Sequence, residues 1–111
     1  MIAVQFENTG AKLTLAAAGH AGAAARGMDP VCAAVTALFY TLAQCLWEQR
    51  QLLEEVPRIR IEDGAAEITA RPAGEGRAAM EHSFWVVYTG LKLLAHNYPE
   101  HIKIQEKGNR I

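Results

Sequence analysis

The stretch DPVCAAVTALFYTLAQCLWE, residues 29–48, decides the fold of this 111-residue chain. Its 18 residues from Pro30 to Trp47 carry no formal charge, which is the lower limit for a membrane-spanning helix. The large apolar residues nevertheless recur at helical spacing with alanines between them, as in a helix that buries one face. They are Val31, Val35, Leu38, Phe39, Leu42 and Leu46. The stretch therefore predicts a buried central helix and no membrane span.

Two signals mark the start of this helix. Asp29 can accept hydrogen bonds from unpaired backbone N–H groups, and the fixed φ of Pro30 suits the first helical position. We expect the helix to continue through Leu52 and Leu53 until Pro57 stops it, which gives about 25 residues and roughly 38 Å. The third residue of the helix is then a cysteine.

The flanking sequence alternates between strand and helix patterns. Residues 2–7 and 12–15 alternate apolar and polar side chains around a turn and predict a β-hairpin, and the Ala- and Gly-rich residues 16–27 predict a pliable loop. Further segments follow in the order strand, strand, helix, strand, at residues 58–62, 65–71, about 77–95 and 102–104. The order ββαββαβ predicts a two-layer α+β fold, with two long helices packed on a largely antiparallel five-stranded sheet and residues 1–111 in one domain.

Composition narrows the function classes. The formal net charge is -1 and Lys and Arg form no run, so we expect no direct nucleic-acid binding. The N-terminus lacks the basic region of a signal peptide, and two cysteines are too few to staple a secreted domain, so we expect a cytoplasmic protein. The His and Cys residues are not spaced as zinc ligands, and we expect neither a metal nor another cofactor.

The two cysteines have different expected roles. Thirteen helical residues separate Cys32 and Cys45 by about 20 Å, whereas a disulfide needs Cα atoms within about 7 Å. At least one is therefore a free thiol. Cys45 lies in mid-helix among leucines and alanines, and we interpret it as a small core residue.

The residues around Cys32 can form a nucleophilic site. The positive end of the helix dipole favours a thiolate there, and unpaired backbone N–H groups, those of Cys32 and Ala33, can hold an oxyanion. His20, twelve residues upstream, can take the thiol proton and return it to a leaving amine. Thr36 lies one turn behind Cys32 and offers a hydroxyl, while Asp29 can either cap the helix or orient the imidazole. From spacing alone, a packing cysteine and a solvated loop histidine are open alternatives.

The sequence also resembles a known family. The string Gly19-His20-Ala21-Gly22, followed by GMDPVCAAVTAL at residues 27–38, is similar to the signature of the ribosomal-processing cysteine protease Prp family, also called YsxB-like. Chain length and element order match as well, so the resemblance covers essentially the whole sequence. It implies a homodimeric cysteine protease that removes a short N-terminal extension from large-subunit ribosomal protein twenty-seven.

The resemblance also assigns the site residues. The family's nucleophile falls on Cys32, its histidine on His20 and its aspartate on Asp29. Thr36 stands where the family usually has Ser, which keeps the hydroxyl and adds a methyl group. The cleaved N-terminal peptide of the ribosomal protein would be the partner of this site.

The segment before the helix is expected to be a mobile loop that substrate orders. Its glycines are Gly19, Gly22 and Gly27. A lid that closes only on the right peptide suits a selective protease. Two alternatives stay open: a thiol redox sensor in which Cys32 is oxidised, and a noncatalytic dimeric module that docks on ribosomal proteins.

Overall fold

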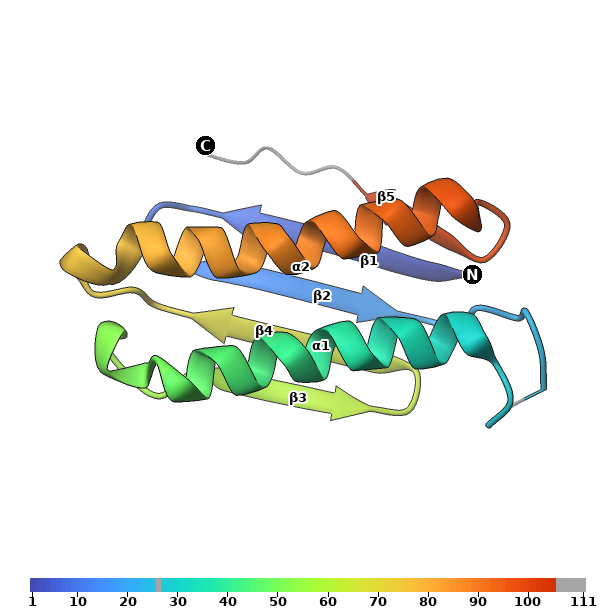
Figure 1. Ribbon diagram of the computed structural model, residues 1–111, viewed down its shortest axis with the longest axis horizontal. Helices are drawn as coiled ribbons and strands as arrows, with labels where there is room; N and C mark the ends of the chain where they lie inside the picture. Colours follow the sequence, from blue (N-terminus) through green and yellow to red (C-terminus); the bar gives the residue numbers. More distant parts are fainter. Residues whose placement is uncertain (26, 106–111) are drawn as a thin grey trace.

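The computed structural model describes residues 1–25 and 27–105 and confirms the predicted order of elements (Figure 1). The strands are β1 (Ile2–Asn8), β2 (Leu13–Ala18), β3 (Arg58–Glu62), β4 (Ala65–Ala70) and β5 (Ile102–Gln105). The helices are α1 (Pro30–Glu48) and α2 (Arg77–Asn97), with short 3₁₀ turns at Arg50–Leu52 and Gly74–Gly76. The sheet order is β3-β4-β2-β1-β5, in which β1 and β5 pair in parallel and all other neighbours antiparallel. The fold is the predicted two-layer α+β arrangement.

Both long helices lie side by side on the same face of the sheet (Figure 1). Burial alternates along β1 and β2, as expected of strands with one covered face. The largest fully buried side chains come from both layers and include Leu13, Leu15, Ile68, Phe39, Leu42, Leu46, Met80, Phe84 and Leu91. One continuous apolar core therefore joins the helices to the sheet.

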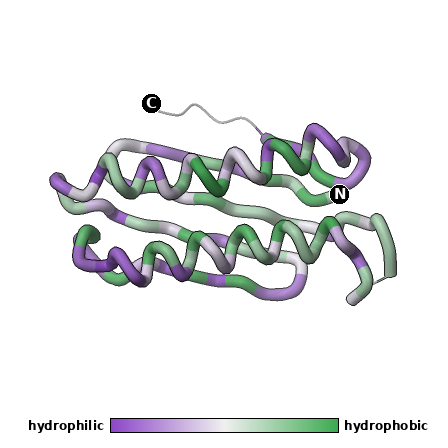
Figure 2. The backbone as a smooth tube through the Cα atoms, in the orientation of Figure 1, coloured by the Kyte–Doolittle hydropathy of each residue, from purple (hydrophilic) through white to green (hydrophobic). Residues whose placement is uncertain are grey.

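In the described part of the chain, α1 is the one helix long and apolar enough to cross a membrane. It is hydrophobic along most of its length, and hydrophilic residues gather toward its C-terminal end (Figure 2). The face that carries Val31 and Phe39 is buried in the core. Leu38 approaches α2 so closely that a Cβ on Gly90 would lie 3.1 Å from Leu38 Cδ2. This packing is that of the predicted core helix.

α1 ends earlier than its sequence predicts. The apolar pattern predicts a helix through Leu53, but α1 stops at Glu48 and a single 3₁₀ turn follows. The chain then extends, and Leu53 forms a β-bridge with Pro72. Leu53 is 8% exposed and belongs to the core. Burial of this side chain outweighs further helix formation, so tertiary packing ends the helix.

β2 is longer than predicted. Residues 16–18 are alanines, a composition that predicts the start of a loop, yet β2 continues through Ala18. Because β2 lies between β1 and β4, its backbone N–H and C=O groups find partners on both sides whatever side chains it carries. Ala18 pairs with Ala65 of β4. The extension brings the next residues, Gly19 and His20, to the β3–β4 turn.

Candidate active site

Asp29 caps the start of α1. Its Oδ1 accepts hydrogen bonds from the N–H of Val31 at 2.9 Å and from the N–H of Cys32 at 3.0 Å. Pro30 has no N–H to satisfy and occupies the beginning of the helix, as predicted. Cys32 therefore lies in the first turn, at the positive end of the helix dipole.

The same carboxylate holds the segment that precedes α1. Its second oxygen, Oδ2, accepts from the N–H of Ala23 at 2.9 Å and from that of Ala24 at 3.3 Å. The N–H of Cys32 contributes most to lowering the pKa of Asp29; burial opposes this effect, and the amides of Ala23, Ala24 and Val31 lower the pKa further. Asp29 thus stays ionised and ties the loop to the helix start.

The backbone N–H groups of Cys32 and Ala33 are both engaged. The first donates to Asp29 Oδ1, and the second donates to the Asp29 carbonyl oxygen at 3.0 Å. The sequence predicts unpaired amides at both positions, whereas in this structure the side chain of Asp29 accepts from Cys32 and its carbonyl accepts the first helical bond, from Ala33. An oxyanion at Cys32 needs another donor.

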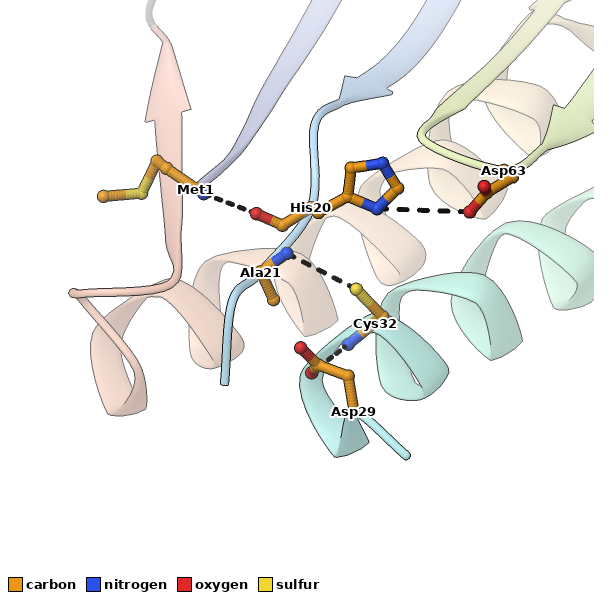
Figure 3. Close-up of polar contacts among 6 residues, drawn as sticks. All are labelled: Met1, His20, Ala21, Asp29, Cys32 and Asp63. Atoms are coloured by element: carbon orange, nitrogen blue, oxygen red, sulfur yellow. Dashed lines mark hydrogen bonds and ion pairs between the residues drawn. The ribbon is translucent and has the colours of Figure 1, made fainter. Parts of the chain in front are cut away.

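The imidazole of His20 lies against the turn between β3 and β4 (Figure 3). His20 Nδ1 is 4.0 Å from Asp63 Oδ1, and a Cβ on Gly64 would come within 3.0 Å of His20 Nε2. The N–H of Gly19 donates to the Gly64 carbonyl at 2.9 Å. The carboxylate beside His20 is therefore that of Asp63. Of the two roles left open for Asp29, the structure shows the helix cap.

Asp63 is recognisable in the sequence only as part of a turn. Its place at the site follows from strand register: Ala18 of β2 pairs antiparallel with Ala65 of β4, so two residues further on His20 lies opposite Asp63. A local pattern does not specify that β2 and β4 are neighbours, because only the order of strands in the sheet decides it. Asp63 could therefore have been predicted as a site residue only from the order of the strands in the sheet.

The thiol of Cys32 faces the segment that carries His20 (Figure 3). Its Sγ accepts a hydrogen bond from the N–H of Ala21 at 3.4 Å. Within residues 1–25 and 27–105, no hydrogen bond joins Sγ to His20. His20, Cys32 and Thr36 nevertheless line the same two cavities, of about 100 and 700 Å³. The structure therefore brings together the histidine, thiol and hydroxyl that the sequence predicts.

The larger cavity extends along α1. Its lining includes Cys32, Thr36 and Tyr40, which are four residues apart and share one face of the helix over about 12 Å. Gly22 and Gly27 line it from the preceding segment. A volume of about 700 Å³ is within the range of clefts that bind small ligands or peptide segments. The cavity can therefore hold several residues of a peptide next to the thiol.

The three glycines between β2 and α1 share a left-handed backbone. Their φ values are 107° at Gly19, 72° at Gly22 and 83° at Gly27. Such angles strain any residue with a side chain, and at Gly19 an added Cβ would also lie 2.3 Å from the Met1 carbonyl oxygen. These positions let the chain turn back so that His20 and Ala21 lie over the start of α1.

Both cysteines are free thiols, which agrees with the prediction that helical spacing keeps them from pairing with each other. Cys45 is half-buried. Its Sγ accepts a hydrogen bond from Gln49 Nε2 at 3.0 Å and lies 3.7 Å from Ser83 Oγ, so it also has polar neighbours. Among the residues that the structure describes, no group of three or more His, Cys, Asp or Glu side chains gathers closely enough to hold a metal ion. Cys32 opens into a cavity that His20 also lines, so it is the thiol placed for acid–base chemistry.

Comparisons with known proteins identify the family. The family model described as cysteine protease Prp matches residues 1–103. A structure of the ribosomal processing protease Prp from S. aureus with a covalently linked product peptide is 23% identical, with a TM-score of 0.73 over 96% of this chain and 100% of that chain. A second structure of that protease, with a substrate peptide, is 22% identical and has a TM-score of 0.68 over 96% of this chain and 100% of that chain. The structure of SMU.848 from Streptococcus mutans is 24% identical and has a TM-score of 0.71 over 99% of this chain and 96% of that chain. No curated protein matches the chain. The chain belongs to the cysteine protease Prp family and is a cysteine protease.

Proposed function

We propose that this protease removes the short N-terminal extension of large-subunit ribosomal protein twenty-seven, with His20 and Cys32 as its catalytic dyad. The observation that carries the proposal is that both side chains line one cavity of about 700 Å³ at the positive end of α1. The S. aureus structures support the substrate class, since they are described as a ribosomal processing protease with a substrate peptide and with a covalently linked product peptide. The same class of peptide is the partner proposed here.

The proposed reaction is an acyl transfer in two steps. His20 takes the proton of Cys32, and the thiolate attacks the scissile carbonyl carbon to form a C–S bond and a tetrahedral oxyanion. The oxyanion collapses, the C–N bond breaks, and His20 returns the proton to the leaving amine. Water then gives a proton to His20 and attacks the thioester. The C–S bond breaks, the thiol regains its proton, and the carboxylic product leaves.

Substrate binding is proposed to close the dyad. Without substrate, Cys32 Sγ accepts from Ala21 and the His20 ring rests against the β3–β4 turn. The His20 side chain is 60% exposed, so the ring can rotate toward Sγ without any repacking of the core. A peptide in the cavity along α1 would displace water from the ring and the thiol, and Thr36 on the same wall offers it a hydroxyl. This closure fits the expectation, drawn from the family resemblance, that substrate orders the segment before α1.

The β3–β4 turn is expected to support the base. Once His20 is protonated, the Asp63 carboxylate stabilises the imidazolium, although solvent weakens the attraction because both side chains are more than half exposed. We expect Asp63→Asn to lower kcat about three- to tenfold and to leave KM unchanged. Gly64→Ala is expected to lower kcat further, because the added Cβ would lie 3.0 Å from His20 Nε2 and the φ of 77° at Gly64 strains a residue with a side chain. Glu67→Gln, the same chemical change on an exposed position of β4, is the control. Equal losses in Asp63→Asn and Glu67→Gln would contradict the role of Asp63.

We further propose that the protease is a cytoplasmic homodimer. Several large apolar side chains are exposed on the two helices, and pairing of two copies would cover them. They are Trp47, Trp85, Val86 and Leu93. Sedimentation at micromolar concentration is expected to give twice the mass of the chain, and the mass of a single chain would contradict the dimer.

The direct test of the function uses the full-length ribosomal protein of the same organism. Purified protease is incubated with it, and the N-terminus of the product is read by mass spectrometry. We expect loss of one short N-terminal segment with the wild-type protease and none with Cys32→Ala. An unshortened protein, or equal shortening by the variant, would overturn the proposed function.

A further inference from the structure

Ala21 connects the thiol to a histidine from the far end of the chain. Its N–H donates to Cys32 Sγ at 3.4 Å, and its carbonyl oxygen lies 2.8 Å from Nδ1 of His101, eighty residues away. Because a carbonyl only accepts, the His101 Nδ1 must carry the proton and donate. Ala21 is 2% exposed, whereas its two partners are half-buried. Both ends of this stretch of backbone are therefore hydrogen-bonded, one to the reacting sulfur.

His101 is held by the sheet rather than by the loop around the site. It lies between α2 and β5, and its N–H donates to the Tyr98 carbonyl at 2.9 Å. Its own carbonyl accepts from the N–H of Ile2 at 2.9 Å. The next residue, Ile102, is 1% exposed and begins β5, which pairs with β1. The donor therefore comes from a turn whose backbone is hydrogen-bonded to the end of α2 and to β1.

We propose that His101 is a positioning residue that acts through the backbone of Ala21 to stabilise the thiolate of Cys32. A hydrogen bond to the charged form of a group favours that form. The contact at the carbonyl also holds Ala21 in place and, through its φ and ψ angles, limits where the Ala21 N–H points. The same N–H lies 3.4 Å from Sγ and could serve an oxyanion formed beside it, since the amides of Cys32 and Ala33 are engaged. The inference rests on Cys32 being the reactive thiol of the proposed function.

The test measures the thiol without any substrate. The rate of Cys32 alkylation by iodoacetamide is followed across pH, with peptide mass spectrometry separating Cys32 from Cys45. His101→Leu and His101→Asn have nearly the same shape, but only the asparagine keeps an N–H donor. We expect His101→Leu to move the midpoint of the pH profile upward by about 0.5 to 1 pH unit, and His101→Asn to restore most of the wild-type profile. The other titratable groups that line the cavities at the thiol are unchanged in every variant; they are His20, Asp29, Tyr40, Glu62 and Asp63.

The controls separate this role from a general effect on folding. His96→Leu removes an exposed histidine from the last turn of α2 and should leave the Cys32 profile unchanged, and the profile of Cys45 should not move in any variant. If His101→Leu does not fold, His101→Phe serves as the second donor-free variant. Identical profiles in wild type and a folded donor-free variant would overturn the proposal, and so would identical profiles in the Leu and Asn variants. A shifted midpoint in a protein that leaves the ribosomal substrate intact would uphold the role of His101 and refute only the proposed substrate.

Discussion

His20→Ala, with Cys32 left in place, is expected to lower kcat/KM for the ribosomal substrate about 10³-fold or more. The imidazole must accept the thiol proton and then donate it to the leaving amine. Nothing else described at the cavity can do both near neutral pH, because the remaining polar groups there are carboxylates, hydroxyls and amides. Cys32→Ala should be equally inactive, since no C–S bond can form. Initial rates of peptide cleavage at several substrate concentrations measure both variants.

The control variant is Cys45→Ala, which removes the other thiol and should keep wild-type turnover.

The two active-site variants, His20→Ala and Cys32→Ala, also distinguish the protease from the alternative functions. A redox sensor needs a reactive thiol but no acid for a leaving amine, so His20→Ala would leave its response to peroxide largely intact. A docking module would bind its ribosomal partner unchanged after Cys32→Ala and would cleave nothing. Full cleavage by His20→Ala would refute the dyad.

Asp29→Ala is expected to have the largest effect on stability. It removes the acceptor for the amides of Val31 and Cys32 at the helix start and for those of Ala23 and Ala24 in the preceding segment. Loss of an N-cap alone lowers Tm by several degrees in a domain of this size, and the lost loop contacts add to it, so we expect a fall of about 5–10 °C. Asp29→Asn keeps one acceptor oxygen and should lie in between. Thermal unfolding followed by circular dichroism measures the Tm of both variants. An unchanged Tm in Asp29→Ala would contradict the stabilising role of the cap.

The same carboxylate gives stability a defined dependence on pH. The folded-state pKa of Asp29 is lower than its ordinary value of 3.8, chiefly because the Cys32 N–H donates to it. As the pH falls, the unfolded chain takes up the proton first, so the stabilisation is complete at neutral pH and is lost as the pH falls through 3.8 and below. The difference in Tm between wild type and Asp29→Asn should therefore shrink between about pH 7 and about pH 3. A difference that grows toward acid would show that the charge of Asp29 does not act in this way.

Predictions from the sequence succeeded where the interacting groups are neighbours in the chain. The start of α1 follows from Asp29 and Pro30, because the capping bonds of Asp29 to Val31 and Cys32 span three residues or fewer. The separation of Cys32 from Cys45 follows from helical rise alone. The end of α1 could not be predicted in this way, because Leu53 leaves the helix pattern to form a β-bridge with Pro72, a distant residue in the sequence.

By itself, the sequence determined the order of elements, the apolar faces that make two layers, and a cysteine in the first turn of a capped helix. Only the tertiary structure decided what surrounds that cysteine. His20 meets Asp63 because β2 pairs with β4, and Ala21 meets His101 because β5 pairs with β1 at the other side of the sheet. The physical reason is that alternation and helical period report which face of an element is buried, whereas strand neighbours are selected by the packing of the whole chain.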